Sequence, residues 1–347
     1  MQVQPVTRHK VAIIGASGYT GVELVRILAN HPYMKIASLV GDSSAGQQYA
    51  AIHPAFQFLD LPQISSFGDF DPEAHELTFC ALPHGASQRI VSAIANRTRV
   101  VDLSADFRLR SVEQYEIWYG RKHQAAELQA KACYGLTEFY RTEIAGSRLV
   151  ACTGCNSATG LFALLPLVQA RVIDLDRITI DLKTGVSGAG RSARVAMLHA
   201  EISEGCRPYS VSRHRHLAEF DQELSIAADE PVRVVFTPHL VPQNRGILAT
   251  VYVIGDASQI HRTLARRYAD ERFVSVLPLG DIPGTRDVRG SNRVHLGVAA
   301  DRNPGVVKVF SVLDNLTKGS SGQAVQNANL MLGLDEDAGL GMLPLLP

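Results

Sequence analysis

The chain has 347 residues, a hydrophobic fraction of 46%, and 34 basic side chains balanced by 34 acidic ones, so its formal net charge is zero. At about 100–200 residues per domain, this length predicts roughly two domains. The balanced charge excludes bulk electrostatic attraction to nucleic acid or to an anionic membrane, and no apolar run approaches the ~20 residues of a membrane helix. With five cysteines and no secretory signal before the first expected strand, we expect a cytoplasmic protein with reduced thiols.

Strand-like and helical segments alternate over the first hundred residues. Short β-branched runs predict strands, and apolar side chains three or four residues apart predict helices. The expected strands cover residues 10–15, 35–40, 77–82 and 100–103, and the expected helices cover residues 20–30 and 88–96. This alternation is typical of βαβ units, so we predict an α/β fold with a doubly wound parallel sheet and helices on both faces.

The pattern changes near residue 152, where strands begin to dominate. A strand at 149–152 and a helix at 156–170 come first, and the last clear helix lies at 321–332. Between them the expected strands cover residues 177–183, 233–238, 246–254, 274–277, 293–300 and 306–313. So many strands with few helices predict a second, central α+β domain with a mixed or mainly antiparallel sheet.

A glycine-rich segment, GASGYTG at residues 15–21, lies between the first expected strand and the first expected helix. Glycines permit positive φ and a close approach of the backbone to a phosphate, and the helix behind them offers free N–H groups and the positive end of its dipole. The spacing GxxGxxG is a variant of the dinucleotide-binding pattern, and a purely structural turn is the alternative. The candidate cofactor contacts are Gly15, Ser17, Gly18, Tyr19, Thr20 and Gly21.

The end of the second expected strand bears on the choice of cofactor. NAD sites place an acidic residue there for the ribose 2′-hydroxyl, but here Asp42 comes late, in a turn with Ser43 and Ser44. Hydroxyl and turn N–H groups suit a 2′-phosphate, so the sequence favours NADP(H), with a plain polar turn as the alternative. The loop after the third expected strand lies where ligands bind in doubly wound sheets, and its candidates are Pro83, His84 and Gly85.

Cys155 is the candidate nucleophile, because it lies between an expected strand and an expected helix, at or next to the helix N-terminus. Helix-end N–H groups stabilise a thiolate and can hold the oxyanion that forms when it attacks a carbonyl. Cys152 and Cys155 form a CxxC pair, which a redox pair or half a zinc site would also use. No second pair follows at zinc spacing, so we expect no metal, and we expect Cys152 to end a buried strand. An inert buried thiol is the alternative for Cys155.

Two histidines, His214 and His216, are candidates for proton transfer at neutral pH. In an extended segment both would point to one face, and we expect His214 to be the acid/base and His216 a positioning residue held by Glu219. Arginine suits phosphate or carboxylate, so Arg108, after the fourth expected strand, and Arg191, after a Gly/Ser turn, are candidate anion contacts. The alternatives are solvated loops and, for the histidines, a two-histidine metal site.

Nine segments in order resemble N-acetyl-γ-glutamyl-phosphate reductases of the semialdehyde dehydrogenase superfamily. They are GASGYTG (15–21), ALPHG (81–85), DLSADFRL (102–109), YGLTE (134–138), GC (154–155), SGAGR (187–191), HRH (214–216) with Glu219, HLVPQNRGILAT (239–250) and DNLTKGSSGQAVQN (314–327). The resemblance implies an NADP-binding Rossmann domain, residues 1–152 completed by 315–347. It also implies a catalytic and oligomerisation domain at residues 153–314, and a homodimer or homotetramer.

The resemblance further implies the chemistry and the residues that carry it. The catalytic cysteine falls on Cys155 and the proposed base on the HRH segment, which implies NADPH-dependent reduction of an acyl phosphate through a cysteine thioester. The SGAGR and SGQA segments would lie near substrate and nicotinamide. The residues expected there are Ser187, Gly188 and Gln323 for the cofactor, and Arg108, Asn156, Arg191 and Glu219 for the substrate.

The segment around the cysteine departs from the usual family sequence, which resembles NPGCYPT, because this chain has CTGCNSAT. A Gly-Cys-Asn form resembles the related lysine-pathway reductase, which acts on an aminoadipyl phosphate attached to an acidic carrier protein. That reductase is the alternative enzyme, although the zero net charge gives no sign of an acidic protein partner. A non-catalytic NADP-binding regulator is the alternative from another class.

Overall fold

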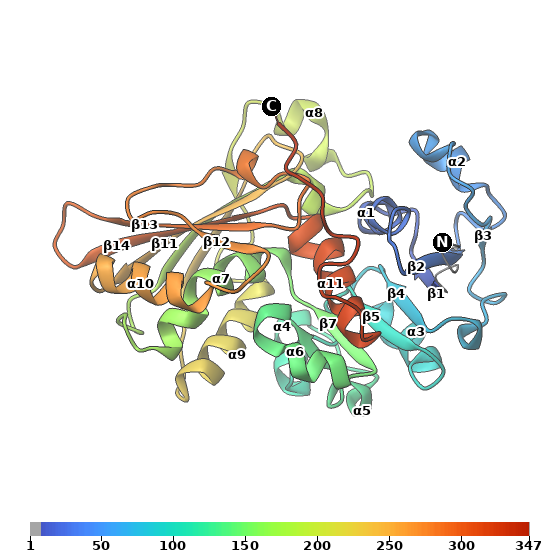
Figure 1. The fold of residues 1–347 in the computed structure, drawn as a ribbon, viewed down its shortest axis with the longest axis horizontal. Helices are drawn as coiled ribbons and strands as arrows, with labels where there is room; N and C mark the ends of the chain where they lie inside the picture. Colours follow the sequence, from blue (N-terminus) through green and yellow to red (C-terminus); the bar gives the residue numbers. More distant parts are fainter. Residues whose placement is uncertain (1–7, 347) are drawn as a thin grey trace, which may run out of the picture. The chain divides into compact units, whose positions relative to one another are not determined.

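The computed structural model describes residues 8–346, which divide into two units (Figure 1). Of these residues, the first unit comprises 8–116, 121–153 and 320–341, and the second comprises 117–120, 154–319 and 342–346. The chain therefore passes from one unit to the other between Thr153 and Gly154, just before Cys155. Among the described residues, no helix is both long and apolar enough to cross a membrane.

The first unit is built on a seven-stranded sheet in the order β3-β2-β1-β4-β5-β7-β6, and every pairing in it is parallel. Its strands are β1 (His9–Ile14), β2 (Met34–Val40), β3 (Ile64–Ser65), β4 (Leu77–Cys80), β5 (Arg99–Asp102), β6 (Cys133–Gly135) and β7 (Leu149–Cys152). Strands β4 and β7 are buried along their whole length, as expected for a parallel sheet covered on both faces. The doubly wound strand order confirms the predicted fold class for this half.

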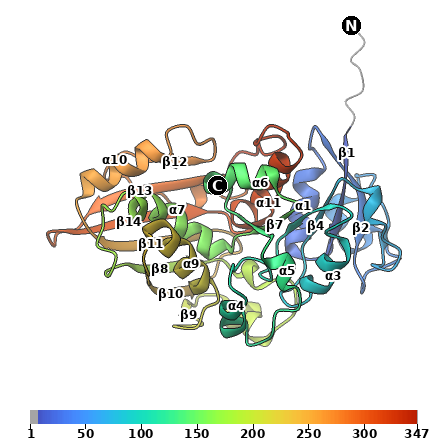
Figure 2. The same ribbon diagram turned by 90° about the horizontal axis from the view of Figure 1, so that it is seen from below.

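Within residues 8–346, seven α-helices belong wholly or partly to this unit, and Figure 2 labels several of them beside its strands. They are α1 (Tyr19–Leu28), α2 (Tyr49–Ile52), α3 (Ser87–Ile94), α4 (Val112–Tyr119), α5 (Ala126–Gln129), α6 (Thr137–Gly146) and α11 (Gly322–Met331). Although α11 comes from the end of the chain, it contacts α1, α6 and strands β5, β6 and β7. The side-chain amides of Gln323 and Asn327 donate to the carbonyl of Gly135, at 2.7 and 3.0 Å, and fix α11 on the sheet.

The second unit is built on a mixed seven-stranded sheet in the order β12-β13-β14-β11-β8-β10-β9. Its strands are β8 (Thr179–Thr184), β9 (Arg207–Pro208), β10 (Val235–Leu240), β11 (Ile247–Ile254), β12 (Val274–Val276), β13 (Val294–Ala300) and β14 (Val306–Leu313). Two pairings, β8 with β10 and β12 with β13, are parallel, and the other four are antiparallel. This confirms the predicted mixed sheet.

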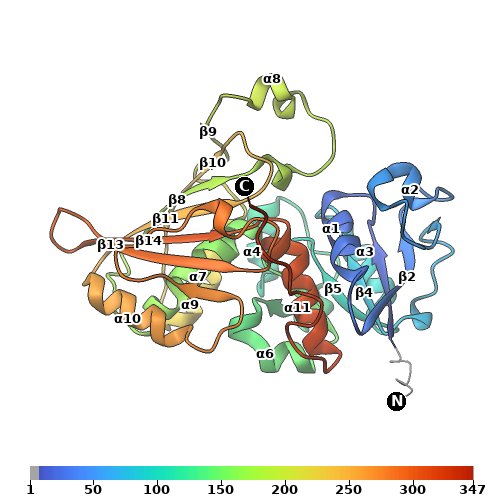
Figure 3. The same ribbon diagram turned by 45° about the horizontal axis from the view of Figure 1, so that its top comes forward.

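Helix α7 (Cys155–Gln169) is the central helix of the second unit, and it is buried from Asn156 to Val168. It contacts β11 and β14 of the sheet and is itself contacted by α9 (His216–Ala228) and α10 (Ala257–Arg267). A helix that is apolar on all sides is stable only when it is enclosed in this way. Figure 3 shows the remaining helix, α8 (His199–Ile202), on a largely exposed segment between β8 and β9.

Candidate active site

The glycine loop of the first unit forms a tight turn between β1 and α1. Gly15 has φ +83°, and a Cβ placed on it would lie 2.4 Å from the carbonyl oxygen of Ala81. A Cβ on Gly21 would lie 2.4 Å from the oxygen of Gly15. Gly18, the N-cap of α1, differs, because a Cβ there would meet nothing closer than 3.7 Å and no side chain caps the helix. The start of α1 therefore has both the room and the unsatisfied N–H groups that a phosphate needs.

Two aromatic side chains that the sequence analysis did not select hold this loop. The hydroxyl of Tyr49 donates to the oxygen of Ala16 at 3.1 Å, and His53 Nε2 lies 3.2 Å from the oxygen of Ser17. Tyr49 is 2% exposed. Both residues come about thirty positions after the loop, with no motif to mark them, so spacing alone could not have revealed them.

The two serines proposed to contact a 2′-phosphate differ in exposure. Ser43 is exposed, whereas Ser44 is buried and its hydroxyl packs against Gly41, where a Cβ would lie 2.7 Å from it. Asp42 is exposed beside them. Of the two hydroxyl groups, that of Ser43 is the one open to a ligand in this structure.

A buried carboxylate, that of Asp106, holds the loop of Pro83, His84 and Gly85 by hydrogen bonds. Asp106 is 0% exposed and accepts hydrogen bonds from the Gly85 N–H, at 2.7 and 2.8 Å to its two oxygens. It also accepts from the N–H of Gln88, at 3.3 Å, and from the hydroxyl of Tyr115, at 2.9 Å. Asp106 thus sets the loop that was predicted to contact the cofactor, and it lies within the DLSADFRL segment without having been selected.

Arg108, the predicted anion contact in the same segment, is 8% exposed, and its Nη2 donates to the oxygen of Leu103 at 3.2 Å. Nearby, Asp102 accepts from the hydroxyls of Ser87 and Ser104, and burial raises its pKa to about 6. Cys152 ends β7 as a buried residue, as predicted, and burial raises the pKa of its thiol to about 12. Such a thiol stays protonated and unreactive.

Cys155 is the first residue of α7, and Gly154 is its N-cap, without a side-chain cap. The Cys155 Sγ lies 3.7 Å from Asn156 Oδ1, and Asn156 Nδ2 donates to the hydroxyl of Tyr209 at 3.1 Å. Asn156 is 1% exposed, so its amide links the cysteine and the tyrosine. Gly319, in the π-helix Thr317–Ser321, packs on the other side, where a Cβ would lie 2.8 Å from Cys155 Cβ.

His216 and Glu219 contact the residue before the nucleophile. A Cβ on Gly154 would lie 2.4 Å from His216 Nε2 and 2.6 Å from Glu219 Oε1. Glu219 is fully buried, its Oε2 accepts from the Gly154 N–H at 2.9 Å, and its Oε1 lies 3.9 Å from His216 Nε2. Any larger residue at this position would displace the ends of these two side chains from the start of α7.

The segment of the two histidines is not extended, so the condition for both rings to point to one face is not met. Residues 211–213 form a turn and α9 begins at His216, so the two rings meet through the turn, with centroids 4.6 Å apart. His214 Nδ1 accepts from the N–H of His216 at 3.1 Å, and its ring packs against Tyr209 and Phe236. Burial lowers the pKa of His214 to about 4, so this imidazole is neutral at physiological pH.

The remaining predicted residues lie at varied depths. In the second unit, the Ser187 hydroxyl donates to the oxygen of Asn244 and accepts from Asn315 Nδ2, while Gly188 and Arg191 are exposed. In the first unit, Gln323 is 1% exposed, and its Oε1 has no hydrogen-bond partner among the described residues. A buried acceptor of this kind suits a ligand that brings a donor.

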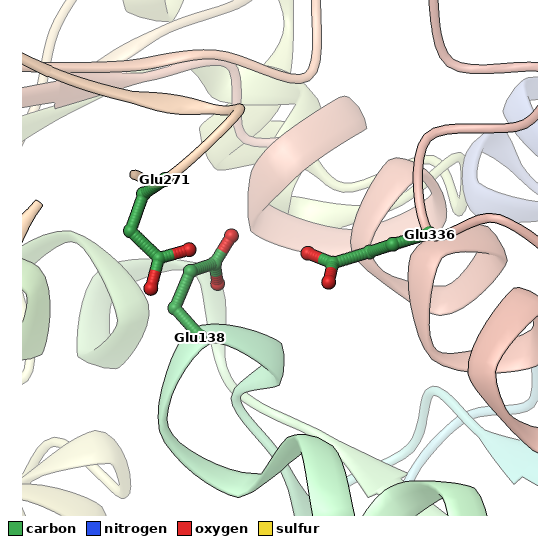
Figure 4. A group of neighbouring side chains, drawn as sticks. All are labelled: Glu138, Glu271 and Glu336. Carbon is green, nitrogen blue, oxygen red and sulfur yellow. The ribbon is translucent and has the colours of Figure 1, made fainter. Parts of the chain in front are cut away.

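Acidic side chains near α11 belong to a separate network. The side-chain nitrogen of Gln326 donates to Glu138 at 3.0 Å and to Glu336 at 2.6 Å, and Arg141 pairs with Glu336 at 2.6 Å. Of the three carboxylates that Figure 4 labels, Glu138 comes from α6 and Glu336 from the segment after α11. Amide and guanidinium donors contact both oxygens of Glu336 and Oε1 of Glu138, which indicates a structural role.

Comparison with known proteins identifies relatives along nearly the whole chain. Residues 10–147 match the NAD-binding domain of semialdehyde dehydrogenases, and residues 155–315 match the dimerisation domain. Proteins named N-acetyl-gamma-glutamyl-phosphate reductase from Cereibacter sphaeroides and Ruegeria pomeroyi are 60% and 58% identical over 340 residues, 98% of this chain and 99% of each relative.

Solved structures share the fold at low identity. Aspartate semialdehyde dehydrogenase II from Vibrio cholerae, complexed with ASA, has a TM-score of 0.72 at 20% identity. Aspartate semialdehyde dehydrogenase with NADP from Candida albicans has a TM-score of 0.70 at 17% identity. Each comparison covers 94% of this chain and 99% of the other.

Proposed function

Because the chain belongs to the semialdehyde dehydrogenase family, we propose that it reduces N-acetyl-γ-glutamyl phosphate to N-acetylglutamate semialdehyde and phosphate with NADPH, in arginine biosynthesis. The observation that carries the proposal is the position of Cys155 at the uncapped start of α7, with His216 and Glu219 packed on Gly154. The identity of the substrate is inferred from relatives at about 60% identity, which are named N-acetyl-gamma-glutamyl-phosphate reductase.

Cys155 is the nucleophile. The N–H groups in the first turn of α7 favour its thiolate, which attacks the acyl carbon of the substrate and forms a thioester as phosphate leaves. Cys152 takes no part, because its buried thiol stays protonated at physiological pH. Asn156 is buried between Cys155 and Tyr209, so its position supports an orienting role beside the nucleophile.

His216 is the residue we assign to proton transfer. Its Nε2 faces Gly154, and the buried carboxylate of Glu219 lies beside it, which stabilises the imidazolium that forms when it accepts a proton. The expected assignment was the reverse, with His214 as the acid/base. We now infer that His214 positions the loop, because it is neutral and its Nδ1 accepts from the His216 N–H.

The first domain of this family binds a nicotinamide cofactor, and we infer NADP(H). When bound, the cofactor supplies the hydride that reduces the thioester. The residues present fit it: α1 begins with room at Gly18 and with uncapped N–H groups, and Gln323 Oε1 is a buried acceptor that lacks a donor. Exposed Ser43 and the loop of Pro83, His84 and Gly85 are the further contacts we propose.

Arg108 and Arg191 are the proposed contacts for the phosphate and carboxylate of the substrate. The match to a dimerisation domain supports a homo-oligomer, and we propose a dimer or tetramer. Five free cysteines fit a reducing, cytoplasmic compartment. The lysine-pathway reductase is not favoured, because the relatives above carry the glutamyl name.

An assay in the oxidising direction tests the proposal. The purified chain is given NADP⁺, phosphate and either N-acetylglutamate semialdehyde or N-acetyl-aminoadipate semialdehyde, with Cys155→Ser as the inactive control. We expect phosphate-dependent NADPH formation with the glutamate compound. A clear preference for the aminoadipate compound would move the chain to the lysine pathway, and no turnover of either by a folded, NADP-binding chain would favour a regulator.

A further inference from the structure

The oxygen of the substrate's acyl group becomes negatively charged twice in the proposed reaction, once when the thiolate adds and once when hydride adds. Hydrogen-bond donors that are already in place to stabilise this charge make a large contribution to lowering the activation barrier. One obvious donor is already engaged, because the Gly154 N–H donates to Glu219 Oε2 at 2.9 Å. The remaining N–H groups of α7's first turn would share the task with any side-chain donor beside Cys155.

The Tyr209 hydroxyl is a side-chain donor near Cys155. Asn156 connects it to the nucleophile, since one end of the Asn156 amide lies 3.7 Å from Cys155 Sγ and the other donates to the Tyr209 hydroxyl at 3.1 Å. The charge of Cys155 is close enough to Tyr209 to act on its ionisation. Its backbone N–H donates to the oxygen of Pro238 at 3.0 Å and its ring packs edge-on against His214, so the side chain is held in place.

The Tyr209 hydroxyl has a proton to give. The one hydrogen bond that the structure gives this hydroxyl is accepted from Asn156, and no acceptor for its own proton is found among residues 8–346. Burial and the nearby Cys155 raise the pKa of Tyr209 to about 12, so it is a neutral donor throughout the working pH range. A neutral O–H that is held rigidly and has no acceptor is suited to an oxyanion that appears only during reaction.

We propose that Tyr209 is a further catalytic residue, which donates a hydrogen bond from its hydroxyl to the acyl oxygen of the substrate while that oxygen is negatively charged. This inference rests on the proposed function. An electron pair of the thiolate forms the C–S bond, and the carbonyl π electrons move to the acyl oxygen. The C=O bond then forms again from this oxygen as the bond from the acyl carbon to phosphate breaks. Hydride addition to the thioester carbon charges the oxygen again, and the C–S bond breaks to restore the thiolate. The tyrosine proton stays on Tyr209 in every step.

The test is Tyr209→Phe, which removes the hydroxyl and keeps the ring against His214. Loss of one oxyanion donor typically lowers kcat by about 10²–10³-fold, so we expect a fall of that order with the KM for NADPH unchanged. The rate at which iodoacetamide alkylates Cys155 should also be unchanged, because that reaction develops no oxyanion. A loss of correctly folded protein would instead lower both kcat and the alkylation rate of Cys155, and it would also lower the melting temperature.

Tyr268→Phe is the matched control. Tyr268 is buried, and its hydroxyl donates to the oxygen of Phe162 within α7 at 2.6 Å, so the same chemical change should lower stability and leave kcat unchanged. Wild-type kcat in Tyr209→Phe would overturn the inference while the proposed function stands. An equal fall in kcat and in alkylation rate would also overturn it, because Tyr209 would then act on the thiolate. Absence of turnover in the wild type would refute the proposed function itself.

Discussion

Replacing Gly154 by alanine tests the contact between the nucleophile's turn and its proton acceptor. The added Cβ would lie 2.4 Å from His216 Nε2 and 2.6 Å from Glu219 Oε1, whereas ordinary contacts begin at 3.4 Å. Both side chains must therefore move back by about 1 Å. A displacement of about 1 Å can cost 10²-fold in rate, and loss of general acid–base catalysis costs about 10²–10⁴-fold. We expect kcat to fall within that range.

Stability should change little, because the displaced atoms are the ends of side chains and alanine at an N-cap costs at most about 1 kcal/mol relative to glycine. Two further glycines serve as controls. Gly160→Ala places a Cβ 2.5 Å from the ring of Phe220, so it should cost about 1–3 kcal/mol of stability without a specific loss of kcat. Gly146→Ala meets nothing within 4 Å and should be neutral. Steady-state kinetics and thermal melts distinguish the three. Wild-type kcat in Gly154→Ala would refute the contact between His216 and the nucleophile's turn.

Three more predictions concern the two histidines and the carboxylate that holds the cofactor loop. His216→Asn should lower kcat by about 10²–10⁴-fold and His214→Asn by less, and the reverse order in steady-state kinetics would restore His214 as the acid/base. The pKa of His214 falls from 6.5 to about 4 on folding, so the unfolded chain binds a proton first as pH drops. About 3 kcal/mol of stability should be lost between pH 6.5 and 4; urea unfolding at both ends of this range should show that His214→Phe lacks this loss. Asp106→Asn should raise the KM for NADPH and leave the KM for the acyl phosphate unchanged, whereas Asp102→Asn should alter neither; a change in both KM values would count against a role confined to the cofactor loop.

The fold was predictable wherever hydrophobic periodicity is long and uninterrupted. The buried runs that became β1, β4, β7 and α7 were found within one or two residues of their observed ends. The short strands β3 and β9, of two residues each, carry too little pattern to be seen. Helix α10 carries sequence signals that predict it, namely Asp256 as a capping residue and Ile260 and Leu264 four residues apart on its buried side.

The site was predictable only where a local boundary defines it. Cys155 follows from a strand that ends three residues before a helix begins, and that can be read along the chain. The contact of Gly154 with His216 and Glu219 joins residues more than sixty positions apart and depends on how α9 packs on α7. The burial of Ser44 likewise depends on a turn that packs its hydroxyl against Gly41, and the residue types in this segment do not predict that packing.

The central claim is that Cys155 carries the acyl group, and the mass of the protein tests it most directly. The chain is mixed with N-acetyl-γ-glutamyl phosphate in the absence of NADPH, quenched in acid and digested for mass spectrometry. We predict one N-acetylglutamyl group on Cys155, lost when NADPH is added before quenching and absent from Cys155→Ser. An active enzyme that forms no adduct, or forms it on another of the five cysteines, would contradict the account.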